Sequence, residues 1–215
     1  MTKARIKKLL TLLDIHYPYT KCFLTYETPW QLMTATILSA QCTDAQVNST
    51  TPGLFAKYPS IQALAEADLD ELANDVRSTG FFRTKARHIK GAMHKLMTEF
   101  DGVMPDDIDV LTTFPGVGRK TANLVIGHIY DIPSIVVDTH VMRVSARLGL
   151  TESKNPAVIE QDLRNCLPKE HWLRFNTQII SHGRAVCTAR RPRCGECVLF
   201  ECCEGRKNEN ECCNG

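Results

Sequence analysis

Four cysteines near the C-terminus constrain the fold of this chain more than any other feature. They follow the spacing C-x6-C-x2-C-x5-C, within seventeen residues, at Cys187, Cys194, Cys197 and Cys203. Soft sulfur ligands select iron–sulfur clusters or zinc, so four thiols in so short a loop indicate a bound metal centre. We therefore expect residues 187–203, the cysteine loop, to close around such a centre.

Two disulfide bonds are the alternative use of these four thiols, and the rest of the sequence argues against them. Residues 1–8 are basic, no apolar segment of a signal peptide follows them, and no run of eighteen apolar residues occurs anywhere. We expect a cytoplasmic protein without a membrane partner, in which thiols stay reduced and such spacing more often binds metal.

Zinc and an iron–sulfur cluster are the two candidates for the bound centre. A tetrahedral zinc site also uses C-x2-C pairs, but a zinc ribbon combines two such pairs and this chain has one. The spacing therefore favours a cluster. Cys202 lies next to Cys203, which leaves the last ligand open by one position. Cys212 and Cys213 lie in a polar tail after about residue 205, which we expect to be disordered.

The hydrophobic periodicity is helical along most of the chain. Residues 28–31 have the pattern of a helix start, with Thr28 as N-cap, a proline at the first position and Gln31 three residues after the cap. A helix is also expected from about Arg83 to Phe100. Only residues 135–137 resemble a strand, and they are too few to form a sheet. The sequence predicts an all-α fold.

The charged residues are unevenly distributed, although the net charge is only +2. Residues 66–75 hold five acidic and no basic side chains, whereas residues 77–95 hold six Lys or Arg and no acidic side chain. Four further arginines lie in or beside the cysteine loop: Arg184, Arg190, Arg191 and Arg193. A charge run is usually a solvated helix face, but two basic segments beside special motifs favour a phosphate-binding surface.

A second motif joins two helices within residues 106–130. A short apolar helix leads into Phe114-Pro-Gly-Val-Gly118, and the next helix starts at Arg119. Gly116 and Gly118, on either side of Val117, permit a tight turn and expose backbone N–H groups at a helix N-terminus, which attracts phosphate. The motif is not a Walker A loop, because no strand precedes it. A plain helical hairpin remains the alternative.

Five features in this order resemble the bacterial endonuclease III family of helix-hairpin-helix DNA glycosylases. They are Leu38-Ser39-Ala40-Gln41 with Thr43-Asp44, the segment from Phe114 to Ala122, Val137-Asp138-Thr139-His140-Val141, His182-Gly183-Arg184, and the four cysteines. The resemblance runs from about the N-terminal helix to Cys203. It implies a [4Fe-4S] cluster on the four cysteines, which in that family presents basic residues to DNA.

The same resemblance implies two helical domains. A six-helix domain with the helix-hairpin-helix motif would span residues 22–132. A discontinuous cluster domain would combine residues 1–21 with residues 133–215, and DNA would lie across the groove between the two. The absence of a visible linker fits this arrangement, because the chain crosses the boundary in short connections.

The resemblance places the chemistry on Lys120 and Asp138. In the first turn of a helix the dipole opposes the charge of Lys120, and nearby burial would favour a neutral amine further. Such an amine can attack the sugar C1′, displace the base and remain as a Schiff base that permits β-elimination. Asp138 would stabilise positive charge on the sugar or activate the lysine. The plainer role of Lys120 is a phosphate contact. That of Asp138 is the N-cap of a helix over residues 139–148.

A base inside a duplex is out of reach, so the nucleotide must be flipped and its gap filled. By resemblance, Gln41 and Phe81 would enter the duplex from two loops, and many relatives have leucine in place of Phe81. The plainer alternatives are that Gln41 is a polar residue at a helix C-terminus and that Phe81 is an aromatic residue of the core. The resemblance assigns further DNA contacts to Asp44, Gly116, Val117, Gly118, Arg119 and His140.

The expected function is base excision repair. The chain would act as a monomeric glycosylase and abasic-site lyase on oxidised pyrimidines in damaged double-stranded DNA, at a bacterial nucleoid. One alternative is an adenine-mismatch glycosylase, which shares the cluster and Asp138 but typically lacks the lysine and has a further C-terminal domain. Another is a non-catalytic iron–sulfur or zinc DNA-binding module, which would not need Lys120.

Overall fold

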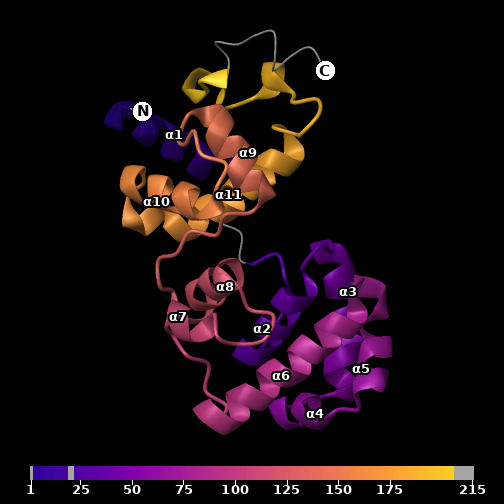
Figure 1. The fold of residues 1–215 in the computed structure, drawn as a ribbon. Coiled ribbons are helices and arrows are strands. Elements are labelled where there is room, and N and C mark those ends of the chain that lie inside the picture. Colours follow the sequence, from indigo (N-terminus) through magenta and orange to yellow (C-terminus); the bar gives the residue numbers. More distant parts are fainter. Residues whose placement is uncertain (1, 19–21, 206–215) are drawn as a thin grey trace. The chain divides into compact units, whose positions relative to one another are not determined.

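The structure, a computed structural model, describes residues 2–18 and 22–205 of the 215-residue chain. Every regular element in this part of the chain is an α-helix or a 3-10 helix (Figure 1). The all-α prediction is therefore confirmed for the described residues. Residues 135–137 form no strand, and the tail expected after about residue 205 lies outside the described residues.

The chain divides into two compact units, one of residues 22–132 and one of residues 1–21 with 133–215. The first, here the hairpin unit, has seven α-helices and one 3-10 helix, where the resemblance implies six helices. They are α2 (Pro29–Leu38), α3 (Asp44–Lys57), α4 (Ile61–Glu66), α5 (Leu69–Asp75), the 3-10 helix η1 (Arg77–Thr79), α6 (Phe82–Phe100), α7 (Ile108–Leu111) and α8 (Arg119–Tyr130).

Helix α6 organises the core of the hairpin unit. Its residues Ile89, Met93 and Leu96 are fully buried and lie on one face, as the apolar spacing predicts. This face contacts α2, α4 and α5, and Figure 1 shows α4 and α5 alongside α6. The buried face also includes a cation, Lys85.

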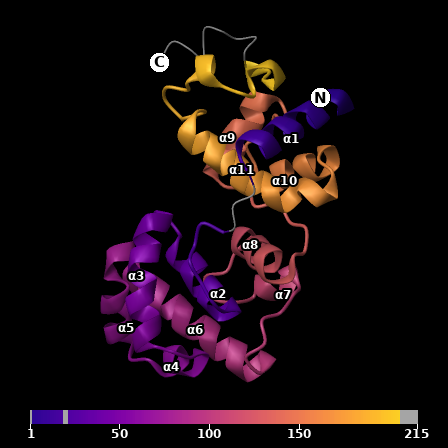
Figure 2. The same cartoon turned by 180° about the vertical axis from the view of Figure 1, so that it is seen from behind.

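The second unit, here the cysteine unit, joins the N-terminal helix to the last third of the chain. Its elements are α1 (Lys3–His16), α9 (Thr139–Leu148), α10 (Pro156–Cys166), η2 (Lys169–His171), α11 (Trp172–Ala185), η3 (Cys194–Glu196) and η4 (Phe200–Cys202). Helices α1 and α9 both contact α11 (Figure 2). Phe175 of α11 packs in one core with Leu9 of α1 and Val144 of α9, so distant segments share one hydrophobic cluster.

Helix starts follow the capping signals of the sequence. The backbone N–H of Thr28 donates to Gln31 Oε1 at 3.1 Å, and the Asp68 side chain accepts from the Glu71 N–H at 2.9 Å, which starts α2 and α5. Helix α6 ends before Gly102, whose φ is +76°. Within residues 2–18 and 22–205, no helix combines the length and apolar character needed to cross a bilayer.

Candidate functional site

The turn between α7 and α8 is built around Gly116 and Val117. The backbone N–H of Val117 donates to the Phe114 carbonyl at 3.1 Å, and Val117 is buried beneath the turn. Gly116 has a φ of +75°, and a Cβ there would lie 2.7 Å from the His88 ring. Only glycine fits this position, which accounts for the first glycine of the motif.

The second glycine has a different environment. Gly118 is the N-cap of α8, has a φ of −91°, and has no atom within 4 Å of the place that a Cβ would occupy. Gly116 and Gly118 are both exposed, whereas Val117 between them is buried. The backbone N–H groups at the start of α8 therefore face an open surface, as an anion site at a helix N-terminus requires.

Lys120 and Arg119 are exposed in the first turn of α8. The position at the helix N-terminus agrees with the sequence analysis, but the burial that we expected around Lys120 is absent from the described chain. The reason is local: the buried face of α8 begins at Ala122, one residue beyond Thr121, so the first turn projects out of the core.

Asp138 lies in the cysteine unit and is the N-cap of α9. Its Oδ1 accepts a hydrogen bond from the Val141 N–H at 2.7 Å, so the predicted helix over residues 139–148 and its cap are confirmed. The side chain is half-buried. This hydrogen bond fixes the carboxylate in place through one oxygen and leaves the other oxygen outside the helix cap.

His140 and Gly183 bring α9 close to α11. Arg143 Nη2 lies 3.1 Å from His140 Nδ1 and donates to the Gly183 carbonyl, also at 3.1 Å. A Cβ on Gly183 would lie 2.9 Å from the His140 ring, so the glycine of His182-Gly183-Arg184 permits this approach.

Gln41 and Phe81 occupy two loops of the hairpin unit with left-handed backbones. Their φ values are +52° and +47°, which non-glycine residues adopt at some cost in free energy. The Gln41 side chain is exposed, and that of Phe81 is 65% exposed. The alternative of a core aromatic at Phe81 is therefore wrong. Asp44 is the first residue of α3 and is half-buried.

The basic segment of residues 77–95 is only partly a surface. Arg77, Arg83 and Arg87 are exposed. The two lysines Lys85 and Lys90 instead turn inward and donate to backbone carbonyls of the same unit. The expected phosphate-binding surface therefore does not include these two lysines, because Lys85 lies on the buried face of α6 and the half-buried Lys90 is held by the Ala67 carbonyl.

The cysteine loop is held against α9 by two arginines. Arg143 donates to the Cys187 carbonyl at 3.0 Å, and Arg147 donates to Cys187 Sγ at 3.2 Å and to the Thr188 carbonyl at 2.7 Å. The sequence analysis missed both residues, although their i, i+4 spacing places them on one helix face. A guanidinium that donates to sulfur is a partner suited to a thiolate ligand.

The four thiols expected as ligands are half-buried, whereas Cys202, which also lies in the cysteine loop, is buried. Cys202 is 1% exposed in the core, whereas Cys187, Cys194, Cys197 and Cys203 are intermediate. Burial raises the pKa of the Cys197 thiol to about 11. This contrast favours Cys203 over Cys202 as the last ligand.

A buried histidine connects α1 with the cysteine loop. The Tyr17 hydroxyl lies 2.9 Å from His182 Nδ1, and His182 Nε2 lies 3.7 Å from Cys197 Sγ. Burial lowers the pKa of His182 to about 4, so the ring is neutral near pH 7. Tyr17 was another residue that sequence analysis missed, because its partner is 165 positions away.

Whether a cluster fits depends on the four thiols expected as ligands and on the groups around them. Among the described residues, no three His, Cys, Asp or Glu side chains are arranged to hold a metal ion. A four-iron cluster occupies the space between its ligands, so its sulfur ligands stand farther apart than those of a single ion. Half-buried thiols, a guanidinium aimed at one of them and neighbouring basic residues fit that larger, negatively charged group.

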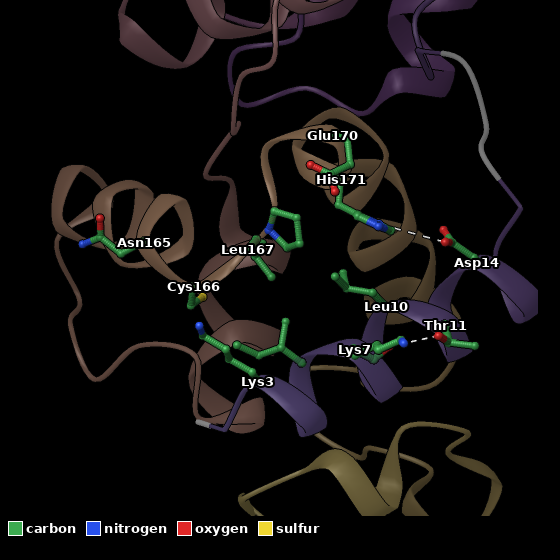
Figure 3. Close-up of a pocket in the computed structure, with 12 residues that line it drawn as sticks. Lys3, Lys7, Leu10, Thr11, Asp14, Asn165, Cys166, Leu167, Glu170 and His171 are labelled. Atoms are coloured by element: carbon green, nitrogen blue, oxygen red, sulfur yellow. Dashed lines mark hydrogen bonds and ion pairs between the residues drawn. The ribbon is translucent and has the colours of Figure 1, made fainter.

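The cysteine unit also has a cavity of about 630 Å³ (Figure 3). It is bordered by α1, α10 and η2, with Lys3, Lys7 and His171 among its lining side chains. None of the site residues expected from the sequence lines it. The candidate chemistry is therefore carried by exposed helix ends and loops, not by this cavity.

Comparisons with known proteins show the family to which this chain belongs. A family model described as HhH-GPD superfamily base excision DNA repair protein matches residues 34–169. The endonuclease III of Synechocystis sp. is 51% identical over 202 residues, covering 94% of this chain and 92% of the relative.

Two solved structures are also similar, a non-covalent endonuclease III–DNA complex and a trapped endonuclease III–DNA covalent intermediate. Each has a TM-score of 0.92 and 39% identity and covers 98% of this chain, with 99% and 100% of the respective structures covered. By sequence and by structure, the chain belongs to the endonuclease III family within the HhH-GPD superfamily of base excision DNA repair proteins.

Proposed function

We propose that this protein is a bifunctional DNA N-glycosylase and abasic-site lyase that removes oxidised pyrimidines from damaged double-stranded DNA. The observation that carries the proposal is Lys120, an exposed amine in the first turn of α8 directly behind the glycine turn. The similar structure of a trapped covalent intermediate supports it, since in that protein a covalent bond joins enzyme and DNA.

Lys120 acts as the nucleophile. Its neutral Nζ forms a bond to the sugar C1′, and the bond from C1′ to the base breaks, so that the base leaves with the electron pair and takes up a proton. Opening of the sugar ring gives an iminium ion. Loss of the C2′ proton then expels the phosphate at C3′, which cleaves the strand by β-elimination.

Asp138 acts on the same sugar as a fixed negative charge. The hydrogen bond from Val141 holds one carboxylate oxygen, so the group keeps its position during the reaction. Positive charge develops at C1′ as the base departs, and a preorganised carboxylate stabilises that charge without reorganisation. The cap and the electrostatic role are therefore compatible on one side chain.

DNA is held through its phosphates and opened through two loops. The DNA phosphates are contacted by the N–H groups around Gly116 and Gly118, at the positive end of the α8 dipole, and by Arg119. His140 and Asp44 make further contacts with the DNA. Gln41 and Phe81 enter the duplex and fill the space that the flipped nucleotide leaves. An exposed phenyl ring can stack on the orphaned base, which accounts for a large apolar side chain at an exposed position.

A [4Fe-4S] cluster, when bound, would be held by Cys187, Cys194, Cys197 and Cys203 and would serve as a structural clamp. Arg143 and Arg147 tie the first ligand to α9, and the arginines of the cysteine loop then lie at fixed positions for DNA. We propose residues 22–132 as the helix-hairpin-helix domain and the cysteine unit as the cluster domain of a monomer that acts on nucleoid DNA. The alternatives of an adenine-mismatch glycosylase and a non-catalytic module are less well supported, because this chain has Lys120 and its similar relatives are endonuclease III.

The test of the proposal is Lys120→Gln. We expect loss of base excision and of covalent trapping by borohydride, with binding to an abasic-site analogue retained because the turn amides remain. Lys154→Gln, which changes an exposed lysine outside the site, is the matched control and should trap like the wild type. A lysine that only contacts phosphate predicts the reverse, weaker binding with trapping intact on saturated DNA, and this result would refute the mechanism.

A further inference from the structure

Lys85 is a buried cation on α6 that the reaction described above does not use. Its side chain is 3% exposed. Its Nζ donates to the Leu38 carbonyl at 2.8 Å and to the Thr79 carbonyl at 2.6 Å. Burial lowers the pKa of Lys85, which shows that the charge is unfavourably placed unless its hydrogen bonds compensate.

Both acceptors are the last residues of helices. Leu38 ends α2 and Thr79 ends η1, where carbonyl groups have no partner within the helix and carry partial negative charge. One ammonium group therefore caps two helix ends at once. These helices are separated by about a third of the hairpin unit in sequence, so the contact fixes their ends at one mutual spacing.

Each capped end leads directly into a loop with an exposed side chain at its tip. The Leu38 end leads to Gln41, and the Thr79 end leads to Phe81. Both tip residues have left-handed backbones, so each loop holds a conformation that its own residues do not favour. The backbone N–H of Lys85 also donates to the Phe81 carbonyl at 3.0 Å, which connects the lysine to the second loop twice.

We propose that Lys85 is a positioning residue that holds the Gln41 and Phe81 loops at a fixed spacing, so that the two side chains enter the duplex together. The inference rests on the proposed function. Lys85 touches neither the DNA nor the reacting atoms in this account. It acts through the two loops, and its contribution is therefore to nucleotide flipping and not to the chemistry at C1′.

Lys90 provides a comparison within the same helix. Its Nζ donates to the Ala67 carbonyl at 2.6 Å, directly after the end of α4, and it is half-buried. Lys85 and Lys90 thus share a helix, a residue type and a carbonyl partner at a helix end. Only the acceptors of Lys85 lead into the loops with Gln41 and Phe81. If both lysines only stabilised the fold, substitution of either should affect the reaction in the same way. The positioning role predicts that only substitution of Lys85 impairs nucleotide flipping.

The experiment compares Lys85→Met and Lys90→Met on one oxidised pyrimidine in two duplexes, in which the lesion is either fully paired or mispaired. Flipping costs less from a mispair, so the ratio of the two single-turnover excision rates reports the flipping step. We expect Lys85→Met to lower the excision rate on the order of tenfold or more on the paired lesion, because small misplacements of groups that act on the substrate can cost this much. The loss on the mispaired lesion should be much smaller. Lys90→Met should keep the wild-type ratio.

A second measurement tests whether Lys85 acts through the loops. In a Phe81→Ala background, Lys85→Met should lower the excision rate on the paired lesion by a smaller factor than in the wild type. One of the two side chains that Lys85 positions is already absent there. Equal losses in both backgrounds would overturn the proposal, as would equal losses of Lys85→Met on paired and mispaired lesions.

Folding is checked by circular dichroism before these rates are compared. If Lys85→Met does not fold, Lys85→Arg replaces it, since the longer planar guanidinium keeps the charge but must displace the two carbonyls. The same preferential loss on the paired lesion is expected, and a wild-type ratio would overturn the proposal. Failure of the proposed function is distinguishable, because the wild-type protein would then show neither excision nor borohydride trapping.

Discussion

At the scale of single residues, Asp138 combines a structural and a chemical role, and the two can be separated. Asparagine is an equally good N-cap, so Asp138→Asn should keep the hydrogen bond from Val141 and leave thermal stability nearly unchanged. The lost negative charge should reduce base excision on the order of a hundredfold or more, measured in single-turnover assays.

Asp68 offers a matched control for this substitution. It caps α5 in the same way, with its side chain accepting from the Glu71 N–H at 2.9 Å, and it belongs to no candidate site. Asp68→Asn should change neither stability nor rate. If Asp138→Asn retained full excision, the carboxylate would be a cap only and the electrostatic role would be wrong.

The residues that sequence analysis identified and those that it missed differ in their partners. Lys120, Asp138 and the cysteines belong to short local motifs, so the sequence alone marks them. Lys85 and Arg147 each bind the backbone carbonyl of a residue about forty or more positions away, Leu38 and Thr188 respectively. Every residue has such a carbonyl, so these contacts leave no pattern in the sequence of the acceptor. The tertiary fold is needed to reveal them.

At the scale of elements, the two glycines of the hairpin turn should respond differently to substitution. Gly118 has room for a Cβ and an ordinary φ, so Gly118→Ala should fold normally. Its methyl group would stand where a phosphate approaches the start of α8, so affinity for undamaged duplex should fall severalfold. The salt dependence of binding should be unchanged, because no charge is removed.

The companion variant at Gly116 should fail for a structural reason. Its φ of +75° and the contact of a Cβ with His88 at 2.7 Å predict that Gly116→Val destabilises the hairpin unit. Gly53→Ala on α3, where a Cβ also meets nothing within 4 Å, is the control and should bind like the wild type. Unchanged affinity of Gly118→Ala would remove the turn amides from the DNA interface.

Helix boundaries were the most predictable level of the fold. The structure confirms the expected starts of α2 and α9: Asp138 caps α9 with its side chain, whereas α2 is capped through Gln31 Oε1 and the buried Thr28 Oγ1 has no hydrogen-bond partner among the described residues. One-turn elements such as α7 and η1 have too few residues for a periodic signal, so their extents come from tertiary contacts instead. The exposure of Lys120 was missed for a related reason, since periodicity does not show where a buried face begins.

At the scale of the whole molecule, the cysteine unit brings the first helix onto the last third of the chain. Arg5 of α1 donates to the Leu148 and Cys202 carbonyls, and Leu9 and Leu13 join the core around Phe175. Periodicity predicts each helix but not this association, which depends on contacts between residues more than a hundred positions apart. A bound cluster would hold the C-terminal end of this arrangement.

The last prediction compares two adjacent cysteines that differ in burial. Cys202 fills the core at 1% exposure, and Cys203 is half-buried in the cysteine loop. The purified wild-type protein should be brown and contain about four irons per chain. Cys203→Ser should lose most of the iron and the colour, because a cluster ligand is removed. Cys202→Ser should keep both but lower the melting temperature, since a hydroxyl replaces a buried thiol. Stoichiometric zinc without iron after anaerobic purification would refute the cluster, and the reverse result for the two variants would assign the fourth ligand to Cys202.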